Sequence, residues 1–322
     1  MRIEILGPLE AWDSGVSVLP SAGKPRQLLA LLALNHGRLV TSATLAEELW
    51  HDKVPRSVNT TLQTYILQLR RKLDTARGRT GKRTGKDLLV TRHSGYQLQL
   101  RDDELDTSEH ERLIRAGAQA VEAHDDARAS TLLAQALSLW RGTPLVDVPI
   151  GPQLELEVMR LEQLHLSAVE RWIEAELRLG RHHGLLSELA VLCARHPLNE
   201  TLQTGYMLAL YRAGRQWQAL DAYRRLHTVL RRELRVEPSG RTQQLMRAIA
   251  ASDPALDHAP HQMIGVAGSG GPGIPTSSPT RSGTPSSTRS SPAGFDGSTC
   301  GVSTSIDAQP ADIAQRVAAA GS

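Results

Sequence analysis

The amino-acid sequence predicts a mainly α-helical protein with small antiparallel β elements. Three observations support this: an amphipathic helix followed by a basic hairpin, a helical middle region with an internal repeat, and a C-terminal region rich in Gly, Ser, Thr and Pro. They divide the 322 residues into segments 1–101, 102–252 and 253–322. A chain of this length is expected to hold two folded units and some additional sequence.

The N-terminal segment opens with short strands and two helices. Ile3 and Ile5 alternate with polar residues ahead of a Gly-Pro turn, which is typical of a small antiparallel sheet. Pro25 suits the first turn of a leucine-rich helix, and Gly37 provides its end. A short second helix is expected over residues 44–50, whose leucine and tryptophan side chains join the same core.

A third helix, over residues 58–73, is the most informative stretch of the chain. Its apolar residues are spaced three or four apart and form one buried stripe of Val58, Leu62, Ile66, Leu69 and Leu73. The opposite surface carries mostly hydroxyl, amide and guanidinium groups and consists of Thr60, Gln63, Thr64, Leu67, Arg70 and Arg71. This face offers hydrogen-bond donors and acceptors to a partner.

A basic hairpin follows this helix. Residues 78–86, GRTGKRTGK, predict a flexible basic loop without an apolar anchor. Residues 88–100 hold two alternating runs joined at a turn that contains Arg92 and His93. A helix with a polar face followed by a basic hairpin is the layout of a winged helix-turn-helix domain that reads duplex DNA, and we expect residues 1–101 to form one.

The middle segment is helical throughout. Ser108 and Glu111 have the spacing of a capping box at its start. Helices are expected over residues 108–123, 126–140, 153–179, 184–195, 200–213, 216–234 and 239–250. Residues 179–181 recur in similar form as residues 213–215, and a spacing of 34 between paired helices is the tetratricopeptide period. Generic packing of helical hairpins is the alternative to an all-α tetratricopeptide-like domain over residues 102–252.

The last segment, residues 253–322, includes runs such as GSGGPG and SSPTRSGTPSSTRSSPAG. Such a composition cannot bury enough apolar area to offset the entropy lost on ordering. The sequence predicts a disordered tail, with at most a weak helix near residues 313–320.

Charge is distributed unevenly along the chain. Residues 1–101 hold 16 Lys and Arg against 8 Asp and Glu, whereas residues 102–253 hold 18 against 22. A basic first third joined to a mildly acidic middle is expected of a nucleic-acid-binding module linked to an interaction module. The N-terminus lacks a signal peptide, no stretch is long and apolar enough to span a membrane, and two distant cysteines suit a reducing cytoplasm.

Nothing in the sequence points to catalysis. Cys193 lies in an apolar helical run and is interpreted as a buried small hydrophobe, and His196 before a proline as a loop or cap residue. His182 and His183 lack a carboxylate or cysteine at metal-ligand spacing, and no Gly-Lys is followed by Ser or Thr as a phosphate loop requires. We expect no enzyme activity, no cofactor and no metal.

Several motifs resemble those of the antibiotic regulatory proteins of streptomycetes. In the first segment they are LGPLEAW (6–12), KPRQLLALLAL (24–34), TLAEELW (44–50), TLQTYILQLRRKL (61–73) and SGYQL (94–98). In the second they are ALSLWRGTPL (136–145), ALYRAGRQWQALDAYRRL (209–226) and ELRVEPSGRTQQL (233–245), with further matches at residues 175–182. The resemblance covers residues 1–251 and leaves the Gly/Ser/Pro-rich tail outside it.

The resemblance implies an OmpR/PhoB-type winged-helix domain followed by a bacterial transcriptional activation domain of tetratricopeptide type. It implies a pathway-specific activator of a secondary-metabolite gene cluster, which binds direct repeats beside the promoter, self-associates on the DNA and recruits RNA polymerase holoenzyme. The nucleotide-binding ATPase of larger family members has no counterpart in this sequence.

On this interpretation the helix over residues 58–73 enters the major groove, where each base pair shows a distinct pattern of donors and acceptors. Gln63 can pair with adenine, and Arg70 with guanine or a phosphate. Thr60 and Thr64 are short enough for phosphates or a thymine methyl, and Leu67 adds an apolar contact.

Other basic residues are expected to fix the register without reading sequence. Arg71, Lys72 and the loop over residues 78–86 are assigned to phosphates. Resemblance to the response-regulator class places Arg92 at the hairpin tip, beside His93, where it can enter the minor groove. Both are alternatively ordinary solvated turn residues.

The sequence thus predicts a cytoplasmic, nucleoid-associated transcriptional activator whose partners are double-stranded DNA and RNA polymerase, without a membrane partner. Two alternatives remain open. A repressor would share every DNA-binding feature, and a tetratricopeptide-type adaptor would bind DNA only non-specifically.

Overall fold

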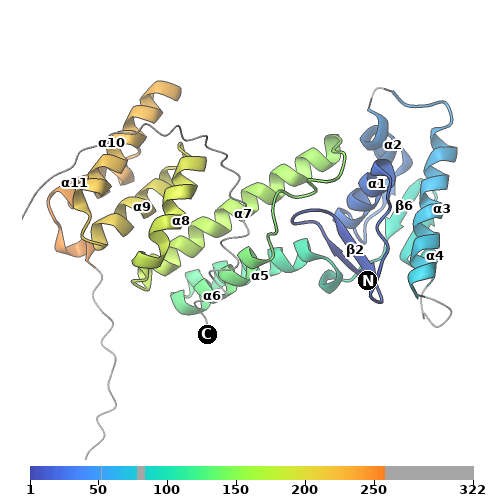
Figure 1. Cartoon of the computed structure of the whole chain (residues 1–322), viewed down its shortest axis with the longest axis horizontal. Helices are drawn as coiled ribbons and strands as arrows, with labels where there is room; N and C mark the ends of the chain where they lie inside the picture. Colours follow the sequence, from blue (N-terminus) through green and yellow to red (C-terminus); the bar gives the residue numbers. More distant parts are fainter. Residues whose placement is uncertain (52, 78–83, 258–322) are drawn as a thin grey trace, which may run out of the picture. The chain divides into compact units, whose positions relative to one another are not determined.

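The computed structural model describes residues 1–51, 53–77 and 84–257 (Figure 1). Its first element is a three-stranded antiparallel sheet of β1 (Arg2–Glu4), β2 (Glu10–Asp13) and β3 (Val16–Ser17), in that order. Ile3 pairs with Ala11 across β1 and β2, and both side chains are buried. The small sheet expected ahead of the first helix is confirmed.

Three helices follow the sheet: α1 (Gly23–Leu34), α2 (Ser42–Trp50) and α3 (Val58–Arg77). Helix α1 is buried almost throughout, and Gly37 adopts a φ of +71° just beyond its end, a backbone conformation that favours glycine. Thr41 caps α2 by accepting the Thr44 N–H, at 3.1 Å. The helices share one core, in which Leu28, Leu45 and Leu62 are at most 1% exposed.

A second antiparallel sheet has the order β4-β6-β5, where β4 is Val40–Thr41, β5 is Leu89–Arg92 and β6 is Gly95–Leu98. The expected hairpin is therefore present. The segment that precedes the hairpin differs from the prediction, because residues 85–88 form a short helix, α4 (Gly85–Leu88), and not the end of a loop. Thr84 and Asp87 form the reciprocal capping box that starts this helix. Residues 78–83 of the predicted basic loop lie outside the described residues.

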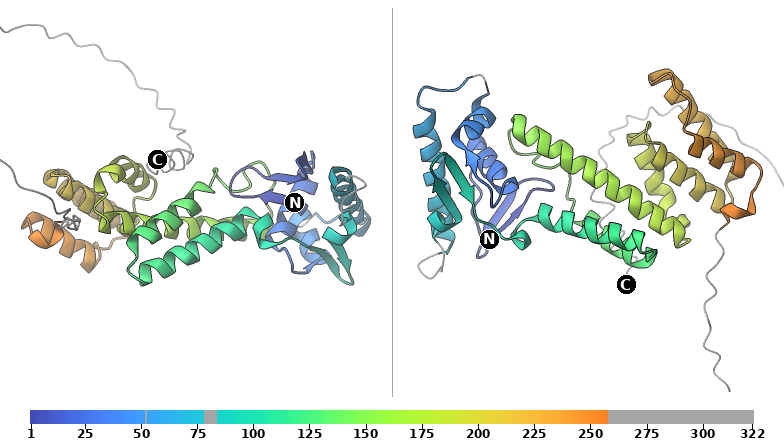
Figure 2. Two further views of the ribbon diagram at one scale, coloured as in Figure 1. Left: turned by 90° about the horizontal axis from the view of Figure 1, so that it is seen from below. Right: turned by 180° about the vertical axis from the view of Figure 1, so that it is seen from behind.

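The rest of the described chain is helical (Figures 1 and 2). After a short 3-10 helix, η2 (Asp102–Glu104), it contains α5 (Asp106–Glu122), α6 (Asp126–Ser138), α7 (Pro152–Arg178), α8 (His182–Arg195), α9 (Glu200–Arg212), α10 (Gln216–Glu233) and α11 (Gly240–Ala250). Each helix predicted within residues 102–252 is present, with ends displaced by at most two residues, whereas α3 ends at residue 77 and not at residue 73. This confirms the mainly α-helical fold class with small antiparallel sheets.

The predicted capping box at the start of α5 is wrong. The helix begins two residues earlier than expected, at Asp106, so Ser108 lies inside its first turn and the N-cap residue is Leu105. The cause is tertiary: Leu105 is 3% exposed and forms a β-bridge with Ile3, which holds the chain in place before the helix starts.

The internal repeat corresponds to two equivalent helix ends. Gly180 and Gly214 have φ values of +76° and +74°, and the following residues donate back to the preceding helix: Arg181 N–H to Glu176 O and Arg215 N–H to Leu210 O. This is the Schellman arrangement, in which glycine is preferred at the left-handed position. The same turn ends α5 with His124 at that position (φ +57°).

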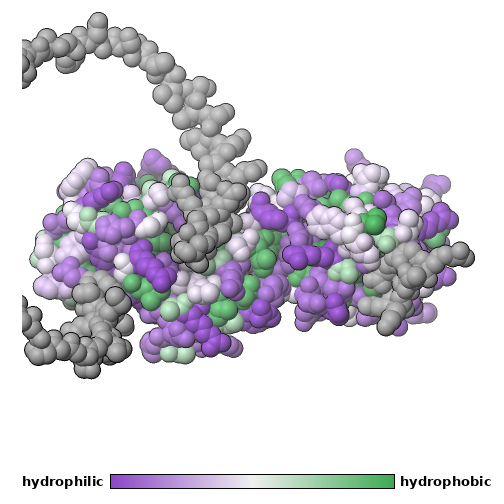
Figure 3. Space-filling view, turned by 60° about the horizontal axis from the view of Figure 1, so that its bottom comes forward, coloured by the Kyte–Doolittle hydropathy of each residue, from purple (hydrophilic) through white to green (hydrophobic). Residues whose placement is uncertain are grey.

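Residues 253–257, expected to belong to the tail, pack on the helical segment. Pro254–Leu256 form a 3-10 helix, η3, and the Leu256 carbonyl accepts the Arg212 Nε–H at 2.8 Å. The remaining tail residues, 258–322, lie outside the described residues. Across the described ranges, no helix is both long and apolar enough to cross a bilayer. On the face seen in Figure 3, hydrophilic residues predominate and hydrophobic ones form small scattered patches.

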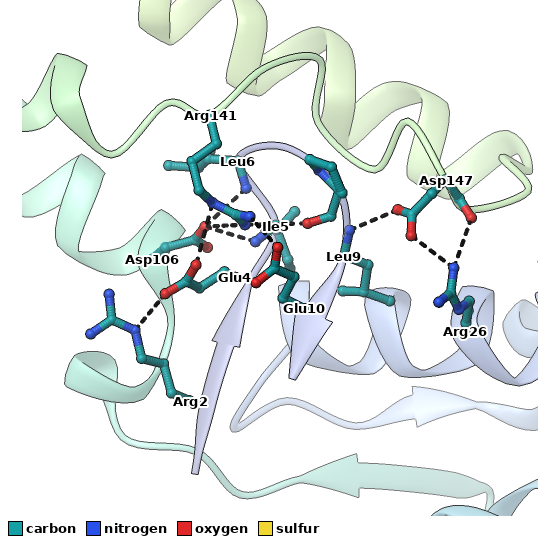
Figure 4. Close-up of polar contacts among 11 residues, drawn as sticks. Arg2, Glu4, Ile5, Leu6, Leu9, Glu10, Arg26, Asp106, Arg141 and Asp147 are labelled. Atoms are coloured by element: carbon teal, nitrogen blue, oxygen red, sulfur yellow. Dashed lines mark hydrogen bonds and ion pairs between the residues drawn. The ribbon is translucent and has the colours of Figure 1, made fainter. Parts of the chain in front are cut away.

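Residues 1–101 and 102–257 contact each other through buried polar groups (Figure 4). Asp106 Oδ2, at the start of α5, accepts the main-chain N–H groups of Ile5 (2.7 Å) and Leu6 (2.9 Å) in the loop after β1. Arg141 approaches the same oxygen at 3.9 Å. Burial raises the pKa of Asp106 to about 6, although these N–H groups and Arg141 act in the opposite direction.

A second carboxylate links the same two parts of the chain (Figure 4). Asp147 Oδ1 accepts the Leu9 N–H at 2.7 Å, and Asp147 Oδ2 pairs with the Arg26 guanidinium at 2.7 Å. Arg26 lies on α1, so this contact ties the loop before α7 to the helices of the first segment.

Candidate nucleic-acid interface

Helix α3 presents one buried face and one exposed face. The predicted apolar stripe is inside: Leu62, Ile66, Leu69 and Leu73 are each at most 3% exposed, and Val58 packs against the same core. The side chains on the other face that are open to solvent include Thr60, Gln63, Thr64, Leu67, Arg71 and Lys72. Because the stripe has the helical period, the buried and exposed faces follow directly from the sequence.

The exposed face of α3 is polar, with one apolar member. Thr64 Oγ1 donates to the main-chain oxygen of Thr60 at 2.9 Å, which leaves the methyl group of Thr64 and lone pairs of its hydroxyl available. Leu67 is 46% exposed on this otherwise polar surface. The face therefore offers hydroxyl, amide and methyl groups in sequence towards the cationic Arg71 and Lys72.

Arg70 departs from the sequence expectation. It is half-buried, and its guanidinium donates to the Leu89 carbonyl from Nε (2.9 Å) and Nη2 (2.6 Å) and to Thr91 Oγ1 from Nη2 (2.8 Å). Burial lowers the pKa of this guanidinium. A contact between Arg70 and a base would require these bonds to break, so we propose that Arg70 supports the hairpin and does not read bases.

The hairpin of β5 and β6 lies next to α3 through these bonds. Arg92 pairs with Gly95 across the hairpin, and the exposed His93 belongs to the turn between them. Arg92 is exposed, and its Nε donates to Gln97 Oε1 at 3.0 Å, which holds the guanidinium along the hairpin. A side chain at Gly95 would overlap the main chain of Val40 in β4, so glycine is needed there to let the hairpin join the sheet.

Two polar residues on α3 were not singled out from the sequence. Asn59 and Gln68 are exposed. Gln68 follows Thr64 by four positions and therefore lies on the same surface. The same helical period that revealed the apolar stripe was a signal for both residues.

The cysteine and histidines of the helical segment that the sequence analysis considered for catalysis or metal binding lie within or next to α8. Cys193 is 7% exposed, and burial raises the pKa of its thiol to about 12, as suits a small hydrophobe. His196 is the residue that follows α8, and His182 and His183 open that helix, with their ring centroids 4.4 Å apart and the rings tilted by 39°. The second cysteine, Cys300, lies outside the described residues.

Comparison with known proteins identifies both parts of the chain. Residues 18–98 match the family "Transcriptional regulatory protein, C terminal", and residues 105–250 match the bacterial transcriptional activator domain. The regulatory protein DnrI of Streptomyces peucetius is 47% identical over 257 residues, which are 80% of this chain and 94% of that protein. The transcriptional regulator RedD of Streptomyces coelicolor is 34% identical over 256 residues, 80% of this chain and 72% of that protein.

A solved structure shares the fold. The structure of Mycobacterium tuberculosis EmbR in complex with a low affinity phosphopeptide matches with a TM-score of 0.74 and 30% identity, covering 79% of this chain and 65% of that one. Both family matches and both named relatives are transcriptional regulators. The chain therefore belongs to the Streptomyces antibiotic regulatory protein family of transcriptional regulators, in which an OmpR-type winged-helix module precedes a bacterial transcriptional activator domain.

Proposed function

We propose that this regulator binds duplex DNA sequence-specifically through α3 and the β5–β6 hairpin, and activates transcription of a secondary-metabolite gene cluster. The observation that carries the proposal is the exposed face of α3, whose hydroxyl, amide and cationic groups stand opposite a fully buried stripe. The major groove admits an α-helix, and these are the side-chain types that read base edges and hold phosphates.

The contacts are divided by chemistry. Gln63 and Gln68 can each satisfy adenine with one donor and one acceptor, and Leu67 can contact a thymine methyl. Thr60, Arg71 and Lys72 are assigned to phosphates, and Arg92 with His93 to the neighbouring minor groove and backbone. We assign DNA binding to residues 1–101 and contact with RNA polymerase to the helical segment, residues 102–257, with residues 258–322 outside both assignments.

Activation is supported by the match of residues 105–250 to an activator domain and by the names of the relatives. Binding to direct repeats, with self-association of two copies on the DNA, is part of the proposal. Two head-to-tail winged helices meet the same face of the duplex when their sites are spaced near one helical turn.

The proposal is tested on DNA upstream of the adjacent gene cluster. A gel shift at physiological ionic strength with scrambled competitor should show preference for the native fragment, and footprinting should show a direct repeat. Equal binding of native and scrambled DNA would contradict the proposal and favour a protein-binding adaptor. Run-off transcription with purified polymerase holoenzyme should rise on adding the protein, whereas a fall would make it a repressor.

A further inference from the structure

A buried carboxylate on α2 holds the start of α7. Glu48 is 1% exposed, and its Oε1 accepts the Gly151 N–H at 2.8 Å. Its Oε2 accepts the N–H groups of Gln153 (2.8 Å) and Leu154 (3.3 Å). Gln27 Nε2 completes the set at 2.9 Å from Oε1. A residue of the winged-helix module thus satisfies three main-chain donors of the activator module.

These donors have no local acceptor of their own. The first N–H groups of a helix lack partners within the helix, and a side chain near the N-terminus normally supplies one. In α7 the N-cap residue is Gly151, which has no side chain to do so. Glu48 acts as the cap from 103 positions earlier in the chain, and its negative charge faces the positive end of the helix dipole.

The contact with Glu48, and not the backbone conformation, requires glycine at position 151. Its φ of −111° and ψ of −177° are open to any residue. A Cβ atom built there would overlap the Glu48 main-chain oxygen and lie 2.6 Å from Glu48 Oε1. Glycine is required because α2 approaches so closely.

We propose that Glu48 is a positioning residue that couples the DNA-binding helices to the activator module. Glu48 lies between Leu45 and Leu49, which are buried in the core that also holds α3, so the contact with Glu48 fixes the position of α7 relative to α3. Asp106 and Asp147 make the reciprocal contacts, from the activator module to the main chain of the first segment. These contacts thereby fix the position of a partner bound to the activator module relative to the DNA. This step rests on the proposed function.

The coupling depends on a carboxylate and not merely on a side chain of that size. Both oxygens of Glu48 act as acceptors, with two N–H donors each. An amide would turn its NH2 group towards N–H donors, leaving at least one of them unpaired in a buried place. Glu48→Gln therefore keeps the volume and breaks the contact.

Three single variants of the full-length protein test the coupling. Glu48→Gln removes the acceptor, and Gly151→Ala opens the same contact from the other side if the first variant folds poorly. Glu47→Gln is the matched control, because Glu47 is the exposed neighbour on α2 and its loss changes the charge equally.

The first measurement is a distance distribution between spin labels attached at Ser21→Cys and Ser167→Cys, which are both exposed positions. Cys300→Ser removes one native cysteine, and the remaining native cysteine, Cys193, is buried. Wild type and Glu47→Gln should give one narrow distribution, and Glu48→Gln and Gly151→Ala a broad one. Narrow distributions in both of the latter variants would overturn the coupling, whatever the DNA results.

The second measurement separates binding from activation. Both coupling variants should bind a single repeat as tightly as wild type, while run-off transcription falls about fivefold or more. Unchanged transcription despite a broadened distribution would also overturn the proposal. If wild type itself fails to discriminate DNA, the proposed function fails, and the distance distributions still decide the coupling.

Discussion

The guanidinium of Arg70 on α3 donates two hydrogen bonds, of 2.9 and 2.6 Å, to the main-chain oxygen of Leu89 on β5. These bonds tie α3 to β5, the strand that carries Arg92, so one side chain sets the relative position of the two elements that we propose to contact DNA. We therefore propose that Arg70 supports this interface.

Replacing Arg70 should test that role. Arg70→Ala is expected to lower the free energy of unfolding by about 1–3 kcal/mol, because the Leu89 carbonyl loses a charged partner. It should weaken binding to cognate and random DNA by similar factors, since the hairpin is displaced in both complexes. Urea unfolding and gel shifts measure the two effects. A selective loss on the cognate site, with stability intact, would return Arg70 to base reading.

Gln63 is the residue from which we expect base discrimination. Gln63→Ala should cost about 1–3 kcal/mol on the cognate site and little on random DNA, because a bidentate contact to one base is lost. Binding isotherms on both DNAs check this. Gln163→Ala, at an exposed position of α7, removes the same group outside the proposed interface and should change neither affinity. Equal losses on the two DNAs for Gln63→Ala would contradict base reading.

Lys72 should govern salt dependence rather than sequence preference. Lys72→Ala is expected to reduce the slope of log K against log salt by about 0.9, the value for one neutralised phosphate. Affinity should be measured from low to physiological salt on cognate and random DNA. Arg128→Ala, an exposed cation on the activator module, is the control for net charge. An unchanged slope for Lys72→Ala would place that side chain off the DNA.

His165 should make the activator module sensitive to acid. Its ring stacks on Trp140 with centroids 4.0 Å apart, and burial lowers its pKa to about 3. The folded state excludes a proton that the unfolded chain binds below about pH 6.5, so this stability is present above pH 6.5 and is lost as pH falls towards 3. His165→Phe keeps the stacking, and its unfolding free energy should fall about 1–2 kcal/mol less between pH 6.5 and 5. Equal pH slopes in urea unfolding would contradict this.

Asp106 should make the folded protein less stable as the pH rises, which is the opposite of the effect of His165. Its folded-state pKa of about 6 lies above the ordinary value of 3.8, so stability is highest below 3.8 and is lost as pH rises through 6. Asp106→Asn keeps an acceptor for the Ile5 and Leu6 N–H groups without the buried charge.

The asparagine variant should therefore be at least as stable as wild type at pH 7.5, by at most about 3 kcal/mol, and the difference should shrink at pH 4.5. Urea unfolding at the two pH values measures it. A loss of stability at pH 7.5 would mean that the ionised carboxylate is favoured at this contact.

Elements whose signal is local were predictable. The stripe from Leu62 to Leu73 defined the buried and exposed faces of α3, and the glycines at 180 and 214 marked equivalent helix ends, since helical period and left-handed turns depend on neighbouring residues. The start of α5 was misplaced because a bridge between Leu105 and Ile3, far apart in the chain, overrides the Ser108 capping signal.

The sequence by itself determined the helices and their apolar faces, the basic hairpin and the family of this regulator. Only the tertiary structure decided the partners of its polar side chains: Arg70 bound to the hairpin and Glu48 capping α7. The physical reason is that an apolar pattern needs only to face a core, whereas a buried hydrogen bond needs one particular acceptor or donor. That partner lies 19 residues away for Arg70 and 103 for Glu48, at a distance no local pattern encodes.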